Sequence, residues 1–247
     1  MSDEMLRQAL FPFQHQAQLA NAVTGFATCL GGIMPLLFCW LYRPQPRRWM
    51  LAYLCILVTG IPTVWLHAYE GNRLISFFDV GTNILLAWAL EIAVSGDFMG
   101  KPARRKLLAA LTTINIGVWI YLAYEVVAPV KRYVITFGSH GGFHFGQVAL
   151  ILNAFVVLGL FIAGYKHIPR EARGLFHLAV CMFLAGLILA TARQSFISNR
   201  VFAWHAVWHL VGAFGFITIW FFNHVRFNEI ERRPQSAEVA SELRQGH

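Results

Sequence analysis

The chain alternates between long apolar segments and short polar connections, and the alternation gives seven apolar segments. Apolar stretches of about 18 or more residues with few charges are typical of helices that cross a lipid bilayer. We therefore predict an all-α, polytopic membrane protein that forms a bundle of seven transmembrane helices. The expected spans are Leu19–Tyr42, Met50–Ala68, Leu74–Ser95, Leu107–Glu125, Phe145–Tyr165, Leu175–Ala192 and His205–Asn223.

The polar segments outside these spans are mostly short and rich in turn-forming residues. The longest connection joins the fourth and fifth spans and contains the glycine-rich sequence GSHGGFHF. From Asn228 onward the chain is polar, which predicts a solvated and partly disordered tail over residues 228–247. The remaining residues, 1–227, are expected to form a single membrane domain.

Composition supports a membrane protein and suggests its orientation. Hydrophobic residues make up 57% of the chain and charged residues only 13%. A net charge of +8 is also found in proteins that bind nucleic acid, but here the basic residues lie in the connections between spans, so we expect no nucleic-acid partner. Alternate connections on one side of the bundle carry 14 Lys and Arg, against 6 on the other. The positive-inside rule then predicts the N-terminus outside and the C-terminus in the cytoplasm.

Four ionisable residues stand out because they lie in or at the ends of apolar segments: His67, Asp79, His205 and His209. Ionisable side chains at membrane depth are costly and usually mark a functional site. His205 and His209 are four residues apart, so a helix presents both rings on one face. Three histidines and one carboxylate are also the residue types of an open catalytic zinc site. We take these four residues as a candidate site.

The predicted orientation places the four residues at similar depth. His67 lies near the outer end of the second span, and His205 and His209 lie at the outer start of the seventh. Asp79 lies about five residues into the third span, roughly 7–8 Å from its outer end. The candidate site is therefore expected towards the non-cytoplasmic side. Thr63 precedes His67 by four residues and shares its helical face.

A second pair of histidines, His140 and His144, has the same spacing and is also expected on the outer side. These residues are either a competing ligand set or a lid over the site. The flanking glycines favour a loop over a rigid ligand platform. We therefore prefer His205 and His209 as metal ligands.

Three short stretches resemble the alkaline ceramidase family: T-V-W-L-H (63–67), D-V-G-T-N (79–83) and W-H-A-V-W-H-L (204–210). That family belongs to the CREST superfamily of seven-span membrane hydrolases, which includes the adiponectin-receptor-like proteins. Its members carry S-x-x-x-H in the second span, an aspartate early in the third and H-x-x-x-H in the seventh, and the three histidines hold zinc. The resemblance covers the seven-span layout, but residues match only in these stretches.

The sequence departs from the family pattern at two places. Thr63 stands where the family has serine, which keeps a hydroxyl and adds a methyl group. The acidic N-terminal cluster that binds calcium in the family is represented only by Asp3 and Glu4, so calcium binding is not implied. The resemblance therefore implies a hydrolase of the superfamily more firmly than it implies a ceramidase.

Residues and resemblance together predict a zinc-dependent, ceramidase-like hydrolase that cleaves the amide of a membrane lipid, such as ceramide or another N-acyl lipid. His67, His205 and His209 would hold Zn²⁺, Asp79 would act as general base, and Thr63 would donate a hydrogen bond to the developing oxyanion. Three alternatives remain open: a receptor-like member of the superfamily with structural zinc, a haem-binding electron carrier, and a proton-coupled transporter. The sequence gives no indication of oligomeric state.

Overall fold

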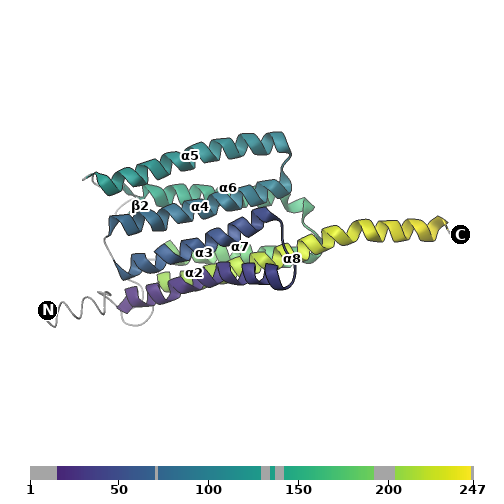
Figure 1. Cartoon of the computed structure of the whole chain (residues 1–247), viewed down its shortest axis with the longest axis horizontal. Helices are drawn as coiled ribbons and strands as arrows, with labels where there is room; N and C mark the ends of the chain where they lie inside the picture. Colours follow the sequence, from purple (N-terminus) through teal and green to yellow (C-terminus); the bar gives the residue numbers. More distant parts are fainter. Residues whose placement is uncertain (1–15, 70–71, 129–133, 137–141, 192–203, 246–247) are drawn as a thin grey trace.

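The computed structural model describes the backbone of residues 16–69, 72–128, 134–136, 142–191 and 204–245. Within these ranges, seven helices are long and apolar enough to cross a membrane, which confirms the predicted number of spans. Figure 1 shows them running side by side along one axis. The helices are α2 (Gln16–Leu41), α3 (Arg47–Ala68), α4 (Arg73–Phe98), α5 (Lys101–Val127), α6 (Phe145–Gly164), α7 (Arg170–Thr191) and α8 (Trp204–Gln245).

Three features differ from the sequence-based expectation. A short antiparallel hairpin of β1 (Val134–Thr136) and β2 (Gly142–His144) lies in the connection between the fourth and fifth spans, where we predicted a loop. The 3₁₀ turn η2 (Tyr165–His167) separates α6 from α7. Helix α8 continues through the polar tail to Gln245, although we expected partial disorder there. Helical hydrogen bonding therefore persists beyond the apolar stretch that marked the span.

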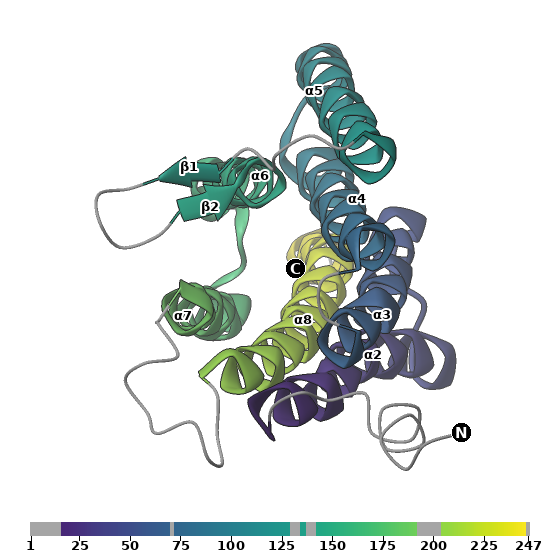
Figure 2. The same cartoon turned by 90° about the vertical axis from the view of Figure 1, so that its left-hand side faces the viewer.

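Helices α3 and α8, which carry the candidate histidines, both pack against α2. Helix α3 lies between α2 and α4, and α8 lies between α2 and α7, while α4 also contacts α5 and α6 (Figure 2). The approach of α2 to α3 is close: a Cβ atom on Gly32 would lie 2.4 Å from the backbone nitrogen of Leu57. Only glycine fits at that position, so the two backbones can meet.

A short connection turns the chain from α3 into α4 and sets the two helices antiparallel. Asn72 caps α4 by accepting hydrogen bonds at its Oδ1 from the backbone N–H groups of Leu74 (3.0 Å) and Ile75 (3.2 Å). Further along, the Thr59 hydroxyl on α3 lies 3.0 Å from the Thr82 carbonyl oxygen on α4. This register brings the end of α3 beside the start of α4.

At the other end of the bundle, Asp97 joins three helices in what we call the Asp97 network. Its carboxylate accepts hydrogen bonds from Arg48, from Trp49 Nε1 (2.9 Å) and from Arg226 (2.5 Å). Asp97 lies on α4, the arginine and tryptophan at 48 and 49 on α3, and Arg226 on α8. A charge at this depth is tolerated when it is paired. The network fixes the relative register of the three helices that carry the candidate site.

Candidate metal centre

Helix α3 ends and α8 begins at the same end of the bundle (Figure 1), and three histidines from these two helices meet there. The ring centroids of His67 and His205 are 4.9 Å apart, those of His67 and His209 are 5.3 Å apart, and those of His205 and His209 are 4.8 Å apart. His209 is buried and His205 is partly buried. Among the described residues, these three histidines form the one group of three or more potential ligands that could hold a metal ion. The structure thus brings together the three histidines that the sequence singled out.

The donor set fits a zinc ion. One ring nitrogen from each histidine lies within 4.8 Å of the others. Two nitrogens bound to one zinc at about 2.0–2.1 Å lie roughly 3.3 Å apart when the geometry is tetrahedral. Small rotations of the side chains would therefore bring all three nitrogens to bonding distance. Three imidazoles leave a fourth position open, as catalytic zinc sites require.

A threonine on α2 fixes the orientation of one of these rings. The Thr24 Oγ1 atom lies 2.8 Å from the Ala20 carbonyl oxygen, to which it donates its proton, and 3.1 Å from His209 Nδ1. A hydroxyl has one proton, so its oxygen accepts a hydrogen bond from Nδ1–H of the ring. His209 is thereby held as the tautomer whose Nε2 lone pair is available to a metal.

Asp79 approaches the same end of the bundle from α4, and a threonine on α3 holds it. The Thr63 hydroxyl lies 2.6 Å from Asp79 Oδ1 and 3.0 Å from the Thr59 carbonyl oxygen of its own helix. Thr63 is buried and one helical turn before His67. The carboxylate is therefore placed at the level of Thr63, at the same end of the bundle as the histidines, and does not belong to the three-nitrogen group itself. In this arrangement the Thr63 proton is directed at Asp79, whereas we had predicted that it would face a substrate oxyanion.

The competing histidine pair falls largely outside the described residues. His140 lies in the segment 137–141, which the structure does not describe, and His144 is described only as a backbone position of β2. The prediction that these two residues do not bind the metal therefore stays a prediction.

Sequence analysis missed Thr24. It lies in the middle of an apolar span, where threonine commonly bonds to its own helix, and nothing in the local pattern sets it apart. Its contact with His209 joins residues 185 positions apart and arises only because α2 packs against α8.

The sequence was compared with models of known protein families and with curated proteins, and neither comparison gives a match. The resemblance of the three short stretches to the alkaline ceramidases stays a prediction.

Proposed function

We propose that this protein is a zinc-dependent intramembrane lipid hydrolase that cleaves the amide bond of an N-acyl lipid such as ceramide. One observation carries the proposal. His67 on α3 converges with His205 and His209 on α8, and a carboxylate held by Thr63 lies at the same end of an apolar bundle. This combination matches the residue types that metal-dependent amide hydrolysis needs.

Each residue of the candidate site would have a separate role. His67, His205 and His209 would hold zinc as neutral imidazoles, with Thr24 fixing the third ring. When bound, zinc polarises the scissile carbonyl and activates a water molecule. Asp79 accepts a proton from the attacking water at Oδ2, because Thr63 occupies Oδ1. As the C–N bond breaks, Asp79 returns that proton to the departing amine, so the products are a fatty acid and a free amine.

The surroundings of the site favour a lipid substrate. Large hydrophobic side chains near the site are exposed on the outside of the bundle, among them Phe26 on α2, Trp65 on α3 and Phe78 on α4. Such a surface suits contact with acyl chains. With the basic residues distributed 14 to 6, we further propose that the N-terminus lies outside, the C-terminus in the cytoplasm, and the site towards the non-cytoplasmic side.

The geometry bears on two of the alternatives. Haem held between two histidines needs room for a porphyrin between the rings, whereas these three rings converge with nitrogens within 4.8 Å. Structural zinc requires no general base, whereas hydrolysis does, and Asp79 is held at the same end of the bundle by a 2.6 Å hydrogen bond from Thr63. Both observations favour a hydrolase.

Elemental analysis of the purified protein, followed by a mass-spectrometric screen of lipid hydrolysis, tests the proposal. We expect about one zinc per chain and release of fatty acid from an N-acyl lipid. His205→Ala and His209→Ala should each lose most of the zinc and the activity, because two imidazoles hold zinc weakly. His140→Ala is the control and should keep both. Stoichiometric zinc without turnover of any lipid would contradict the hydrolase, and zinc loss confined to His140→Ala would contradict the ligand set.

A further inference from the structure

Glu91 is a carboxyl group inside the bundle that the candidate metal centre does not use. It lies on α4, twelve residues after Asp79, which corresponds to about 18 Å along the helix axis at about 1.5 Å per residue. The residue is 0% exposed. Neither of its carboxyl oxygens has a hydrogen-bond partner among the described residues. Buried polar groups in proteins are nearly always hydrogen-bonded, so this one calls for a specific explanation.

The other acidic residues of α4 and α5 are all hydrogen-bonded. Asp79 is held by a threonine on α3, and Asp97 is the centre of the Asp97 network. On α5, Glu125 accepts a hydrogen bond from the Tyr121 hydroxyl at 2.6 Å. In these two helices, as far as the structure describes them, Glu91 is therefore the exception.

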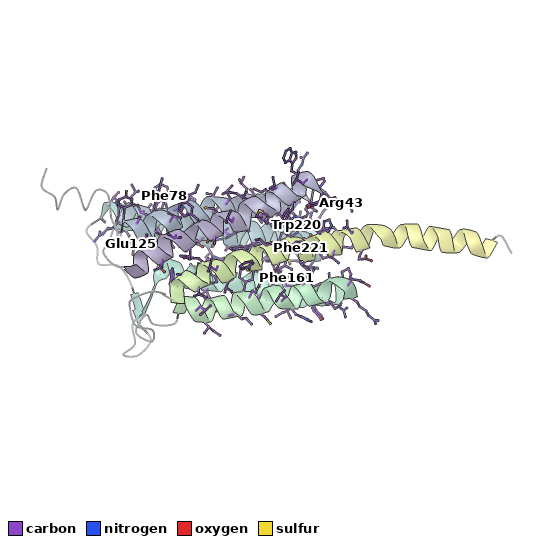
Figure 3. All side chains as sticks on the ribbon, turned by 90° about the horizontal axis from the view of Figure 1, so that it is seen from below. Arg43, Phe78, Glu125, Phe161, Trp220 and Phe221 are labelled. Carbon is purple, nitrogen blue, oxygen red and sulfur yellow. The ribbon has the colours of Figure 1, made fainter. Side chains whose placement is uncertain are left out.

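Glu91 lies on the face of α4 that packs against α6. Ile84, Glu91 and Phe98 are seven residues apart, so they share one face of the helix. Ile84 belongs to a core cluster with Ala149 of α6, and the Phe98 ring lies 5.9 Å from the ring of Phe161 of α6. Figure 3 shows Phe161 inside the bundle, between its two ends. The contacts before and after Glu91 thus place it between the two helices.

A pair of asparagines lies at similar depth. Helices α4 and α6 run in the same direction, so the contacts of Ile84 and Phe98 set Glu91 level with residues 154–157 of α6. Asn153 immediately precedes this range, and its Nδ2 donates to Asn115 Oδ1 on α5 at 2.9 Å. Both asparagines are buried, and Asn115 Nδ2 has no hydrogen-bond partner among the described residues. A carboxyl acceptor and an amide donor therefore lie near the same level with their hydrogen-bonding capacity unused.

The helices that pack against α4 supply no cation for Glu91. Helix α6 contains no ionisable residue, and α5 contains none between residues 107 and 120. The ionisable residues of α3 are Arg47, Arg48, Tyr53, Cys55 and His67, and within the described part of the chain none of them forms an ion pair with Glu91. An ionised carboxylate buried without a partner is strongly unfavourable, whereas the protonated group is neutral.

We propose that Glu91 forms a proton-binding site inside the bundle, with the Asn115–Asn153 pair as its polar neighbour. The ligand is the proton itself, and the carboxyl group is neutral while α6 is packed on α4. Asn115 Nδ2 donates a hydrogen bond to the carbonyl oxygen of the protonated group. Release of the proton places a charge at the contact between α4 and α6, so the proton stabilises that contact.

Infrared spectroscopy of the purified full-length protein in lipid nanodiscs tests this site. The carbonyl stretch of a protonated carboxyl group is separate from the bands of the amides and of ionised carboxylates. Glu91→Gln removes the acid at constant size, and Glu91→Asp keeps the acid on a shorter side chain. Asn115→Leu removes the amide donor. The matched control is Thr113→Val, also a polar-to-apolar change on α5, at an exposed threonine whose hydroxyl bonds to its own helix at 3.0 Å.

We expect a protonated-carboxyl band at neutral pH that Glu91→Gln loses and Glu91→Asp shifts. Asn115→Leu should move the band to higher frequency, because the carbonyl loses a hydrogen bond, and Thr113→Val should leave it in place. Raising the pH should remove the band, and returning to neutral pH should restore it. If the glutamine variant does not fold, the shift in Glu91→Asp decides the assignment.

Identical spectra of the wild type and the Glu91 variants would show an ionised group and overturn the site. A band that persists until the protein unfolds would make the proton permanent and overturn reversible binding. An unchanged frequency in Asn115→Leu would overturn the role of the asparagine pair. Neither zinc content nor lipid turnover enters the readout, so failure here leaves the proposed hydrolase untouched.

Discussion

Two threonines position the groups that surround the candidate metal centre. Thr24 accepts a hydrogen bond from His209 Nδ1, and Thr63 donates one to Asp79 Oδ1. The Thr24 hydroxyl donates its proton to the Ala20 carbonyl oxygen one turn back in its own helix, which leaves its oxygen to accept from His209. The Thr63 hydroxyl has the Thr59 carbonyl oxygen, at 3.0 Å, as a second acceptor beside Asp79. Hydrogen-bond partners of this kind orient a metal ligand or a catalytic base.

Loss of the Thr24 hydroxyl should weaken zinc binding. Thr24→Val keeps the shape of the side chain but removes the side-chain acceptor of His209 Nδ1–H, so the tautomer that offers Nε2 is less favoured. Removing such a partner typically costs about 10–100-fold in metal affinity. Thr24→Ser keeps the hydroxyl and should stay close to wild type. Competition with a zinc chelator measures the dissociation constants, and equal affinities for the valine and serine variants would remove Thr24 from this role.

Asp79 should matter for catalysis and not for metal retention. Asp79→Asn keeps the size of the side chain and some hydrogen bonding but removes the base, so zinc content should survive while turnover falls by about 10²–10⁴-fold. Thr63→Val should cost less, because it disturbs only the orientation of the carboxylate, and Thr63→Ser should be tolerated. Zinc content and turnover are measured on the same samples. Full zinc with near wild-type turnover would remove Asp79 from the mechanism, and an empty site would make it a fourth ligand.

The residues that sequence reasoning could find are those whose chemistry conflicts with their surroundings. Placing a histidine or an aspartate in an apolar span costs free energy, so His67, Asp79, His205 and His209 were apparent without a structure. Placing a threonine in the same span costs little free energy, because its hydroxyl forms a hydrogen bond to its own helix. The partners of Thr24 and Thr63 therefore depended on which helices pack together, and the apolar pattern does not encode that.

At the level of the helices, hydropathy predicts the spans better than it predicts the helix ends. Each apolar stretch became a helix, but α5 begins at Lys101 and not at Leu107, and α8 continues past Asn223 to Gln245. Hydropathy reports which residues suit lipid, whereas a helix ends where its backbone hydrogen bonds do. Pro102 in the first turn of α5 shows the difference, since proline suits a helix start whatever the polarity of its neighbours. The hairpin β1–β2 was missed because each strand spans only three residues.

In the whole molecule, function divides between the two ends of the bundle. The end with the three histidines and Asp79 carries the candidate chemistry, and the opposite end carries the Asp97 network. Helices α3, α4 and α8 reach both ends. The Asp97 network therefore fixes the register that keeps His67, Asp79 and His209 in place, even though it lies near the far membrane boundary.

The orientation of this two-ended bundle in the membrane gives the last prediction. Most of the basic residues lie at one end of the bundle, around the ends of α2, α4 and α6, the starts of the helices that follow them and the last part of α8, 14 against 6 on the other side. Moving basic residues across a bilayer is unfavourable, so we expect that end to stay in the cytoplasm. A reporter that works only in the cytoplasm should be active when fused after His247.

The same reporter should be inactive when fused after Val127, at the histidine end of α5. An alkaline phosphatase reporter, active only outside, should give the opposite pattern at the two fusion points. If alkaline phosphatase were active after His247 and silent after Val127, the bundle would be inverted. The candidate metal centre would then face the cytoplasm, and the substrate would have to be a lipid whose headgroup lies in the inner leaflet.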